Sequence, residues 1–141
     1  MIKTIEVGCA VIEKDGRVLI AQRNPGDSYA GYWEFPGGTR DSGESFEACV
    51  VRELQEEMGI VVRPVRFLFS AAHEDAERRV ELHFYLCDWV SGEPQTIDCQ
   101  DFRWCTIAAL REMKLLPGDD GVVRELLSKQ DVYFNRSGPS A

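Results

Sequence analysis

Residues 38–60, GTRDSGESFEACVVRELQEEMGI, carry the strongest structural signal in this chain. Their second half predicts a helix over 45–58. Gly59 would end that helix, because glycine best tolerates the left-handed conformation that closes many helices. On a helical wheel of about 100° per residue, one apolar face of the segment would bury against a sheet. That face consists of Val51, Leu54 and Met58.

Three glutamates share a different face of the predicted helix. Glu53, Glu56 and Glu57 are spaced at i, i+3 and i+4, so their like charges repel one another. A hard divalent cation with oxygen ligands would offset this repulsion. Arg52 is also placed to pair with Glu56. Taken alone, the three glutamates are interpreted more simply as a solvated acidic helix face. The residues that flank them favour the metal-binding interpretation.

Those flanking residues complete a longer pattern. Gly38 is followed after five residues by Glu44, and after seven more by the segment 52–60, RELQEEMGI. The whole resembles the Nudix box, G-x5-E-x7-R-E-U-x-E-E-x-G-U, and every specified position matches. The resemblance implies an α+β protein with the Nudix fold, an α/β/α sandwich with a mixed β-sheet between helices. It also implies hydrolysis of a nucleoside diphosphate linked to another moiety, with Mg²⁺ or Mn²⁺ as cofactor.

The resemblance also implies roles for individual residues of the box. The implied metal ligands are Glu53, Glu56 and Glu57, joined by a backbone carbonyl near Gly37 or Gly38. The implied catalytic residues are Glu53, the loop glutamate Glu44, and Arg52, which would orient the carboxylates. This set agrees with the chemistry, because phosphoryl transfer depends on positioning and on neutralising charge over the phosphate oxygens. A bound metal also lowers the pKa of the attacking water.

Two segments upstream of the box resemble the MutT branch of the family: AQR at 21–23 and WEFPGG at 33–38. That branch cleaves nucleoside triphosphates, often oxidised or modified ones, to a monophosphate and pyrophosphate, and so sanitises the nucleotide pool. Arg23 matches an arginine that contacts phosphate there, although an ordinary solvated loop arginine would look the same. We also expect Phe35 to take part in substrate binding.

Two aspartates further along the chain, Asp98 and Asp119, each have more than one possible interpretation. Asp98 matches a MutT-branch glutamate that acts as base or metal ligand, and Asp101 is its rival because Asp98 is one methylene shorter. Asp119 would begin the last helix, where aspartate is a preferred N-cap, a duty that Asp120 could share. The MutT resemblance instead implies that the residue at this helix entrance contacts the base. An ionised carboxylate there would favour a base edge that offers donors, as cytosine or guanine does.

The rest of the chain predicts a mixed sheet with helices on its faces. Alternation and turn residues predict strands over 2–13, 18–20, 33–35, 65–72, 80–90 and 102–105. Helices are predicted over 106–113, with Thr106 as cap, and over 119–129. Pro36-Gly37-Gly38 should stop the third strand. We expect one domain over 1–134 and a loose tail over 135–141.

Composition narrows the class of protein. The 16 lysines and arginines against 24 acidic residues give a formal charge of −8, which disfavours a stable nucleic-acid partner. The five cysteines have no C-x-x-C spacing, so we expect reduced, packed thiols. No apolar stretch is long enough to span a bilayer, and the start lacks the apolar core of a secretory signal. We therefore expect a cytoplasmic enzyme with a small nucleotide as partner and no membrane partner.

Two other functions compete with triphosphate hydrolysis. The first is removal of pyrophosphate from the 5′ end of RNA, which a basic channel would support. The second is a Nudix-fold sensor that binds a nucleotide without cleaving it; such modules usually lose the catalytic glutamates, which are all present here. The sequence leaves open the preferred base, the choice between monomer and homodimer, and whether Asp98, Asp101 or a box glutamate is the general base.

Overall fold

The computed structural model describes residues 2–74 and 76–134. Its strands are β1 (Lys3–Lys14), β2 (Arg17–Gln22), β3 (Trp33–Glu34), β4 (Gly37–Thr39), β5 (Val61–Glu74), β6 (Arg78–Ser91) and β7 (Asp101–Thr106). Its helices are α1 (Phe46–Met58), α2 (Ile107–Leu110), α3 (Asp119–Ser128) and α4 (Gln130–Phe134). The tail predicted over 135–141 lies outside the described residues. None of the described helices is long and apolar enough to cross a membrane.

The seven strands form one mixed sheet. Its main path runs β3-β2-β1-β6-β5, with β4 added beside β1 and β7 beside β2. Strands β1 and β6 run parallel over ten residue pairs, from Lys3↔Arg78 to Ile12↔Cys87, and the other named pairs are antiparallel. The central strand β1 therefore joins the β5–β6 hairpin to the strands that carry the upstream motifs.

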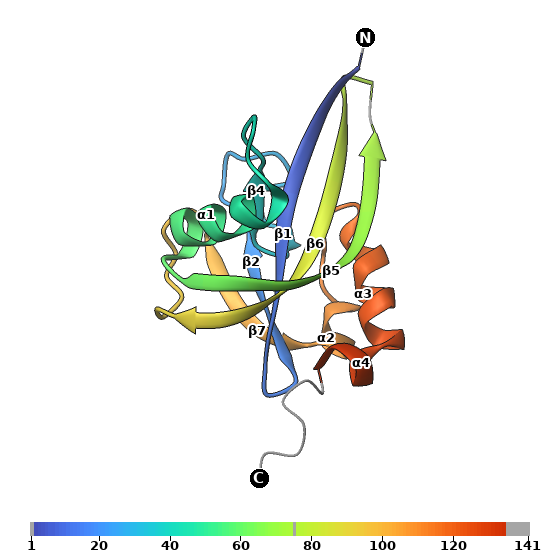
Figure 1. Ribbon diagram of the computed structural model, residues 1–141. Coiled ribbons are helices and arrows are strands. Elements are labelled where there is room, and N and C mark those ends of the chain that lie inside the picture. The colour runs from blue at the N-terminus through green and yellow to red at the C-terminus, as the bar shows by residue number, and fades with distance from the viewer. Residues whose placement is uncertain (1, 75, 135–141) are drawn as a thin grey trace.

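Helices cover both faces of this sheet (Figure 1). Side chains alternate across the central strands: Val11 and Ile20 face α2, α3 and α4, whereas Ile12 and Leu19 face α1. Strand β6 follows the predicted alternation, since Leu82, Phe84 and Leu86 belong to the first of these cores. The prediction of an α+β protein with a mixed sheet between helices is confirmed.

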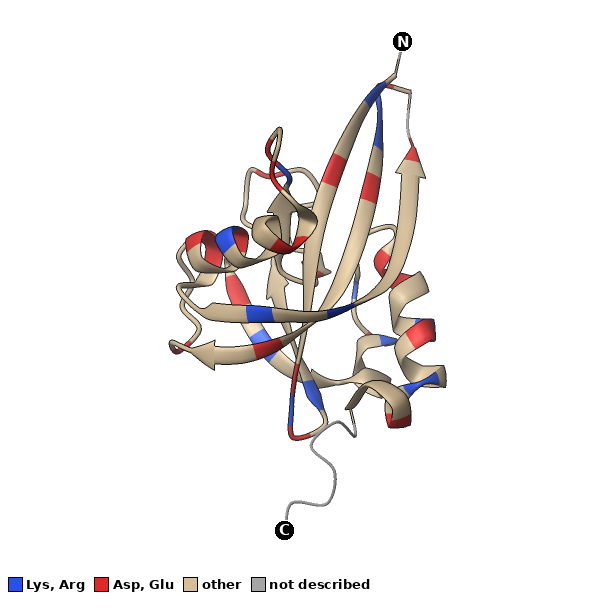
Figure 2. Ribbon diagram, in the orientation of Figure 1, with Lys and Arg blue, Asp and Glu red and all other residues tan. Residues whose placement is uncertain are grey.

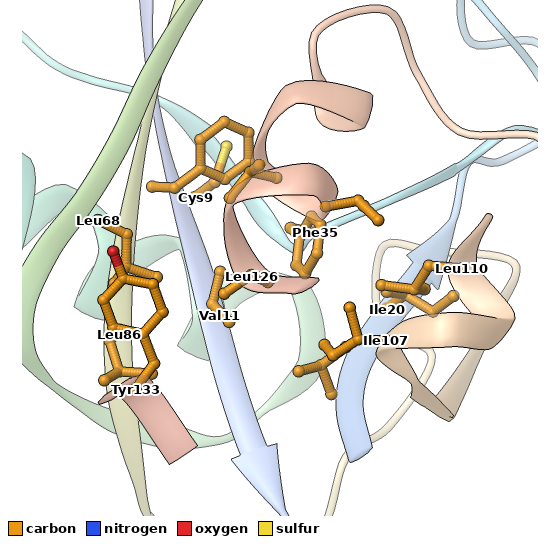
Figure 3. Close-up of a cluster of buried hydrophobic side chains, with 14 of the residues drawn as sticks. Cys9, Val11, Ile20, Phe35, Leu68, Leu86, Ile107, Leu110, Leu126 and Tyr133 are labelled. Carbon is orange, nitrogen blue, oxygen red and sulfur yellow. The ribbon is translucent and has the colours of Figure 1, made fainter. Parts of the chain in front are cut away.

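The larger core lies between the sheet and the C-terminal helices. Figure 3 shows Leu126 of α3 next to Val11 of β1, and Tyr133 of α4 beside Leu86. Phe35 belongs to the same core and packs edge-on against Phe84, with ring centroids 5.8 Å apart. This core fixes the start of α3 against the segment that follows β3.

The structure departs from the sequence prediction most clearly at Pro36-Gly37-Gly38. Strand β3 ends at Glu34, one residue before the predicted end, and Gly37 and Gly38 begin a new strand, β4, paired with Cys9 and Gly8 of β1. A side chain at Gly37 would place its Cβ 1.9 Å from the carbonyl oxygen of Gly8, so only glycine permits this approach. The residues predicted to stop a strand are the ones that allow it to lie against β1.

Smaller differences lie at element ends. The predicted helix over 106–113 is a short α2 of four residues, although Thr106 caps it as expected, accepting a hydrogen bond from the Ala109 N–H at 3.2 Å. Helix α4 was not predicted. It is only five residues long, too short to show a helical period, and it is held by the buried ring of Tyr133.

We expect Leu126→Ala to lower the free energy of unfolding by about 2–5 kcal/mol, because Leu126 is fully buried and the substitution leaves a cavity. Ile97→Ala removes the same number of carbons from a side chain that is 57% exposed, and should cost far less. Urea denaturation of both variants and the wild type measures the difference. Equal losses would contradict the assignment of α3 to the core.

Candidate active site

The helix predicted from the central motif is present with the expected ends. Ser45 is the N-cap of α1, and its Oγ accepts a hydrogen bond from the Ala48 N–H at 3.0 Å. Gly59 closes the helix with φ 70°, and its N–H donates to the Gln55 carbonyl at 3.0 Å. The apolar side of the helix packs against the sheet through Leu54 and Met58. Figure 2 shows acidic residues along α1. The side of the helix that carries Glu53 and Glu57 lies against β4, at Gly38 and Gly37.

Arg52 bonds to several carboxylates on the acidic side of α1. Its guanidinium donates two hydrogen bonds to Glu44, from Nε at 2.7 Å and from Nη2 at 2.9 Å. Its Nη1 donates to Glu53 at 2.9 Å and to Glu56 at 3.1 Å. Its Nη2 also reaches the Thr39 carbonyl at 3.0 Å. One planar cation thus ties the loop glutamate, two helix glutamates and β4 together, as a guanidinium is suited to do.

This pairing has electrostatic consequences on both partners. The bonds from Arg52, helped by the Asp41 N–H, lower the pKa of Glu44 to about 2. The same bonds raise the pKa of Arg52. Glu44 and Arg52 are therefore both charged throughout the neutral range, and they form the permanent ion pair of the site.

Glycines let the carboxylates lie directly on β4. A Cβ on Gly38 would stand 2.2–2.6 Å from the carboxylate atoms of Glu53, so a side chain there would displace that group. The N–H of Gly37 donates to Glu57 at 3.3 Å. Cys49, on the same helix, donates its S–H to the Gly38 carbonyl at 3.4 Å. The helix and the glycine strand are thus in contact through polar groups of the predicted site.

Burial raises the pKa of two of these carboxylates. It raises the pKa of Glu57 well above the usual value, and the neighbouring charges of Glu34, Glu53 and Asp98 add to the effect. Burial also raises the pKa of Glu53, against the opposing influence of Arg52. Gathered carboxylates with raised pKa values mark a place where positive charge would be stabilising.

An acidic cavity of about 220 Å³ lies over this surface. The helix contributes Glu53, Glu56 and Glu57 to its lining, and Asp98 faces it from the loop before β7. The Asp98 N–H donates to the Glu57 carbonyl at 3.0 Å, which fixes that loop on the helix end. Its rival Asp101 is not part of this lining, and its carboxylate accepts from the Phe102 N–H at 2.8 Å.

A second cavity, of about 230 Å³, adjoins the first and is mostly apolar. Side chains such as Val7, Val80 and Leu82 form its walls, and Asp119 lies in it with only 3% of its surface exposed. The Asp119 carboxylate accepts a hydrogen bond from the Phe35 N–H at 3.2 Å. Burial raises the pKa of Asp119 well above its usual range, and Glu34 adds to the shift.

The capping hypothesis for Asp119 is wrong. The N-cap of α3 is Gly118, in a left-handed conformation, and no side chain caps the helix. Hydrogen bonds between two backbone segments bring Asp119 to Phe35 instead. The Trp33 N–H donates to the Lys114 carbonyl at 2.8 Å, and the Leu116 N–H donates to the Trp33 carbonyl at 3.0 Å. The segment before α3 is therefore held alongside β3.

The two upstream residues of the predicted site have different surroundings. Phe35 is 2% exposed and packs in the larger core, and it is also among the residues that line the apolar cavity. Arg23 lines both cavities, and its Nε donates to the Ser28 carbonyl at 2.7 Å. Its Nη1 pairs with Glu34 at 3.2 Å. Sequence reasoning did not single out Glu34, although it lies inside the quoted WEFPGG segment.

The three glutamates on α1 supply the carboxylate oxygens that a hard divalent cation prefers, beside a strand with no side chain in the way, but among the described residues these oxygens do not all lie within 4.8 Å of one another. Elsewhere among residues 2–74 and 76–134, Glu6, Glu81 and His83 place one ligand atom each within 4.8 Å of one another. There, however, Glu6 is paired with Arg40 and Glu81 with Arg79. Arg52 pairs with Glu53 and Glu56 in the same way, so these ion pairs do not decide between the two groups. Glu6, Glu81 and His83 line neither of the two cavities, which makes this group the weaker candidate.

Comparison with known proteins agrees with this geometry. Residues 3–126 match the family model of the NUDIX domain. The CTP pyrophosphohydrolase of Escherichia coli K12 is 37% identical over 117 residues, covering 83% of this chain and 87% of that protein. The 8-oxo-dGTP diphosphatase of the same organism is 30% identical over 125 residues, covering 88% and 97%. The solution structure of the E. coli ORF135 protein matches with a TM-score of 0.83 at 31% identity, covering 99% and 96%.

The chain belongs to the Nudix hydrolase family, and its relatives are of the MutT-like type. The enzyme class predicted from the box, a Nudix pyrophosphohydrolase, is confirmed. Members of this family typically depend on a metal ion.

We expect Asp119→Asn to raise the free energy of unfolding relative to wild type at pH 8, and the gain to shrink toward pH 4. The pKa of Asp119 is higher in the folded chain than the unfolded value of about 3.9. The folded chain therefore binds more protons than the unfolded chain between these two values, and wild-type stability falls as pH rises through that window. Asparagine does not titrate, and its amide oxygen still accepts from Phe35.

Urea denaturation between pH 4 and pH 8 measures this difference. Asp131→Asn is the matched control, because Asp131 is exposed on α4 and is not among the groups whose charges act on Asp119, so this variant should keep the wild-type pH dependence. Glu34 and Asp120, whose charges do act on Asp119, remain in both variants. Parallel curves for wild type and Asp119→Asn would show that Asp119 does not keep its raised pKa in the folded chain.

Proposed function

We propose that this protein hydrolyses nucleoside triphosphates to a nucleoside monophosphate and pyrophosphate, and that cytidine-type or oxidised guanine nucleotides are its preferred substrates. One observation carries the proposal: an acidic cavity on the Nudix helix adjoins an apolar cavity with a buried carboxylate. A nucleotide has the same two-part character, with charged phosphates at one end and a flat, largely apolar base at the other.

The acidic cavity would receive the phosphates. Glu53, Glu56 and Glu57, with a carbonyl of Gly37 or Gly38, would hold Mg²⁺ or Mn²⁺, which supplies the positive charge that phosphate oxygens require in this acidic setting. Arg52 keeps the carboxylates in position through its bonds to Glu44, Glu53 and Glu56. Arg23, which lines the same cavity, would contact a phosphate.

Asp98 is our candidate for accepting the proton of the attacking water. It faces the acidic cavity and is exposed, and its carboxylate takes one hydrogen bond from the Asn24 amide at 3.2 Å, which leaves acceptor capacity. Asp101 lies outside that lining and is engaged by the Phe102 N–H. Attack at the β-phosphorus would release pyrophosphate, as the MutT resemblance implies.

The apolar cavity would receive the base. The Phe35 N–H uses part of the acceptor capacity of Asp119, and the rest is available to a ligand. An ionised Asp119 accepts hydrogen bonds from the amino group of cytosine, or from the N1–H and amino group of a guanine. Relatives that act on CTP and on 8-oxo-dGTP support this choice of bases.

Glu53→Gln should lower kcat by at least about two orders of magnitude with Mg²⁺, since it removes one charged ligand while keeping the shape of the side chain. Folding should survive, because the change relieves repulsion among the helix glutamates. Pyrophosphate release under saturating triphosphate measures the loss, and the thermal midpoint checks the fold. Near-normal turnover in this variant would falsify the assigned metal site.

A panel of normal and modified triphosphates, assayed for pyrophosphate release, tests the substrate proposal directly. Asp119→Ala should lower kcat/KM far more for the best substrate than for poor ones, because an unpaired buried polar edge costs about 1–3 kcal/mol. Asp119→Asn, whose amide both donates and accepts, should change the order of preference among bases. Equal losses for every base would show that Asp119 does not read the base.

A further inference from the structure

The loop between β4 and α1, which carries Glu44, is tied to the central strand β1 by Arg40. The Arg40 N–H donates to the Glu6 carbonyl at 2.8 Å, directly after the β4–β1 pairing ends at Thr39. The guanidinium of Arg40 pairs through Nη2 with the carboxylate of Glu6. Its Nη1 donates to the carbonyl of Glu44 at 2.8 Å. One side chain therefore connects the backbone of a loop residue to β1.

Aromatic contacts limit where the Arg40 guanidinium can lie. Its Cζ is 5.2 Å from the centroid of the Phe46 ring, at the start of α1. That ring stacks in turn on His83 of β6, with centroids 3.9 Å apart and planes 25° from parallel. Because a guanidinium presents several donors in one rigid plane, Arg40 can bond to Glu6 and Glu44 at once from this position.

The position of Glu44 affects the acidic side of α1 through Arg52. The Glu44 carboxylate is 15% exposed and accepts from Nε and Nη2 of Arg52 at 2.7 Å and 2.9 Å. Arg52 also donates to Glu53 at 2.9 Å and to Glu56 at 3.1 Å. A displacement of Glu44 would therefore move Arg52, and with it two of the helix glutamates.

We propose that Arg40 is a positioning residue for the metal site on α1. It fixes the backbone of Glu44 on β1 while Arg52 holds the Glu44 carboxylate, so the helix glutamates keep the arrangement that binds the cation. Arg40 occupies one of the five unspecified positions between Gly38 and Glu44 of the box, and it lines neither cavity. Its role rests on the metal site of the proposed function and extends the support of that site to β1.

The test is Mn²⁺ binding to the full chain without nucleotide, measured from the electron paramagnetic resonance signal of free Mn²⁺. The binding followed is the one that Glu53→Gln weakens, which separates the α1 site from the group of Glu6, Glu81 and His83. Arg40→Ala should raise the Kd of this binding about tenfold or more, the usual effect of losing a group that orients metal ligands. Loss of a positive charge alone would instead strengthen cation binding. A Kd equal to or below that of the wild type would overturn the proposal.

Arg40→Lys separates positioning from a general contribution to stability. Lysine keeps a positive charge for Glu6, but its ammonium is a point charge that cannot reproduce the two-nitrogen bridge from Glu6 to the Glu44 carbonyl. The variant should recover most of the thermal midpoint that Arg40→Ala loses, while its Kd for Mn²⁺ stays raised. Recovery of both quantities together would show that only the ion pair with Glu6 matters, and would contradict a positioning role.

Arg79→Ala is the matched control, because Arg79 makes the equivalent ion pair on the next strand. It pairs with Glu81, the residue opposite Glu6 in the β1–β6 register, at 3.0 Å, and with Glu74 at 3.5 Å. Neither partner belongs to residues 38–60, so this variant should keep the wild-type Kd for Mn²⁺. An equal rise in Kd in this variant would show an effect that is not specific to the Glu44 loop, against the proposal.

A double-mutant cycle with Glu44→Ala tests the route through Glu44. Once the Glu44 carboxylate is absent, Arg40→Ala should change the Kd by no more than about twofold, the margin of ordinary additivity. The full loss in both backgrounds would place Arg40 on another route and overturn the proposal. If the wild type binds Mn²⁺ on α1 but releases no pyrophosphate from triphosphates, the proposed function fails and the role of Arg40 stands. If Glu53→Gln leaves Mn²⁺ binding unchanged, the metal site fails, and the role of Arg40 with it.

Discussion

The site depends on one arginine surrounded by carboxylates. Arg52 donates to Glu44, Glu53 and Glu56 at once, and it reaches the backbone of β4 as well. Without this cation the helix glutamates would repel one another and turn toward water. With it, Glu53 is held against Gly38 of β4, and Glu56 is bonded to the same guanidinium. The sheet and its two apolar cores form the frame, meaning the part of the fold that brings α1, β4 and the apolar cavity together.

A short segment, residues 33–38, connects the two halves of that frame. Glu34 belongs to both cavities, Phe35 anchors Asp119 through its N–H, and Gly38 admits the Glu53 carboxylate. The segment performs these tasks because β3 is paired with β2 and β4 is paired with β1. The central sheet therefore sets the distance between the acidic cavity and the apolar cavity.

Several acidic groups of the site are buried at a cost to stability. The pKa values of Glu57, Glu34 and Asp119 are all raised, chiefly by burial, so their charged forms are disfavoured in the folded chain. The large apolar cores on both faces of the sheet offset that cost. The apolar cores, which lie outside the site, therefore supply the stability that allows these buried carboxylates to remain in it. In their charged forms the carboxylates can bind cations or accept hydrogen bonds.

The sequence by itself determined the helix of the box, its closing glycine, its acidic face and the family, because these depend on short spacings along one helix. It also predicted most strands, since alternation is a local pattern. It did not determine that Gly37 and Gly38 form a strand, that Asp119 faces Phe35 rather than capping α3, or that Glu34 joins two cavities. Those facts come from pairing between residues far apart in the chain, and only the tertiary structure sets which of them meet.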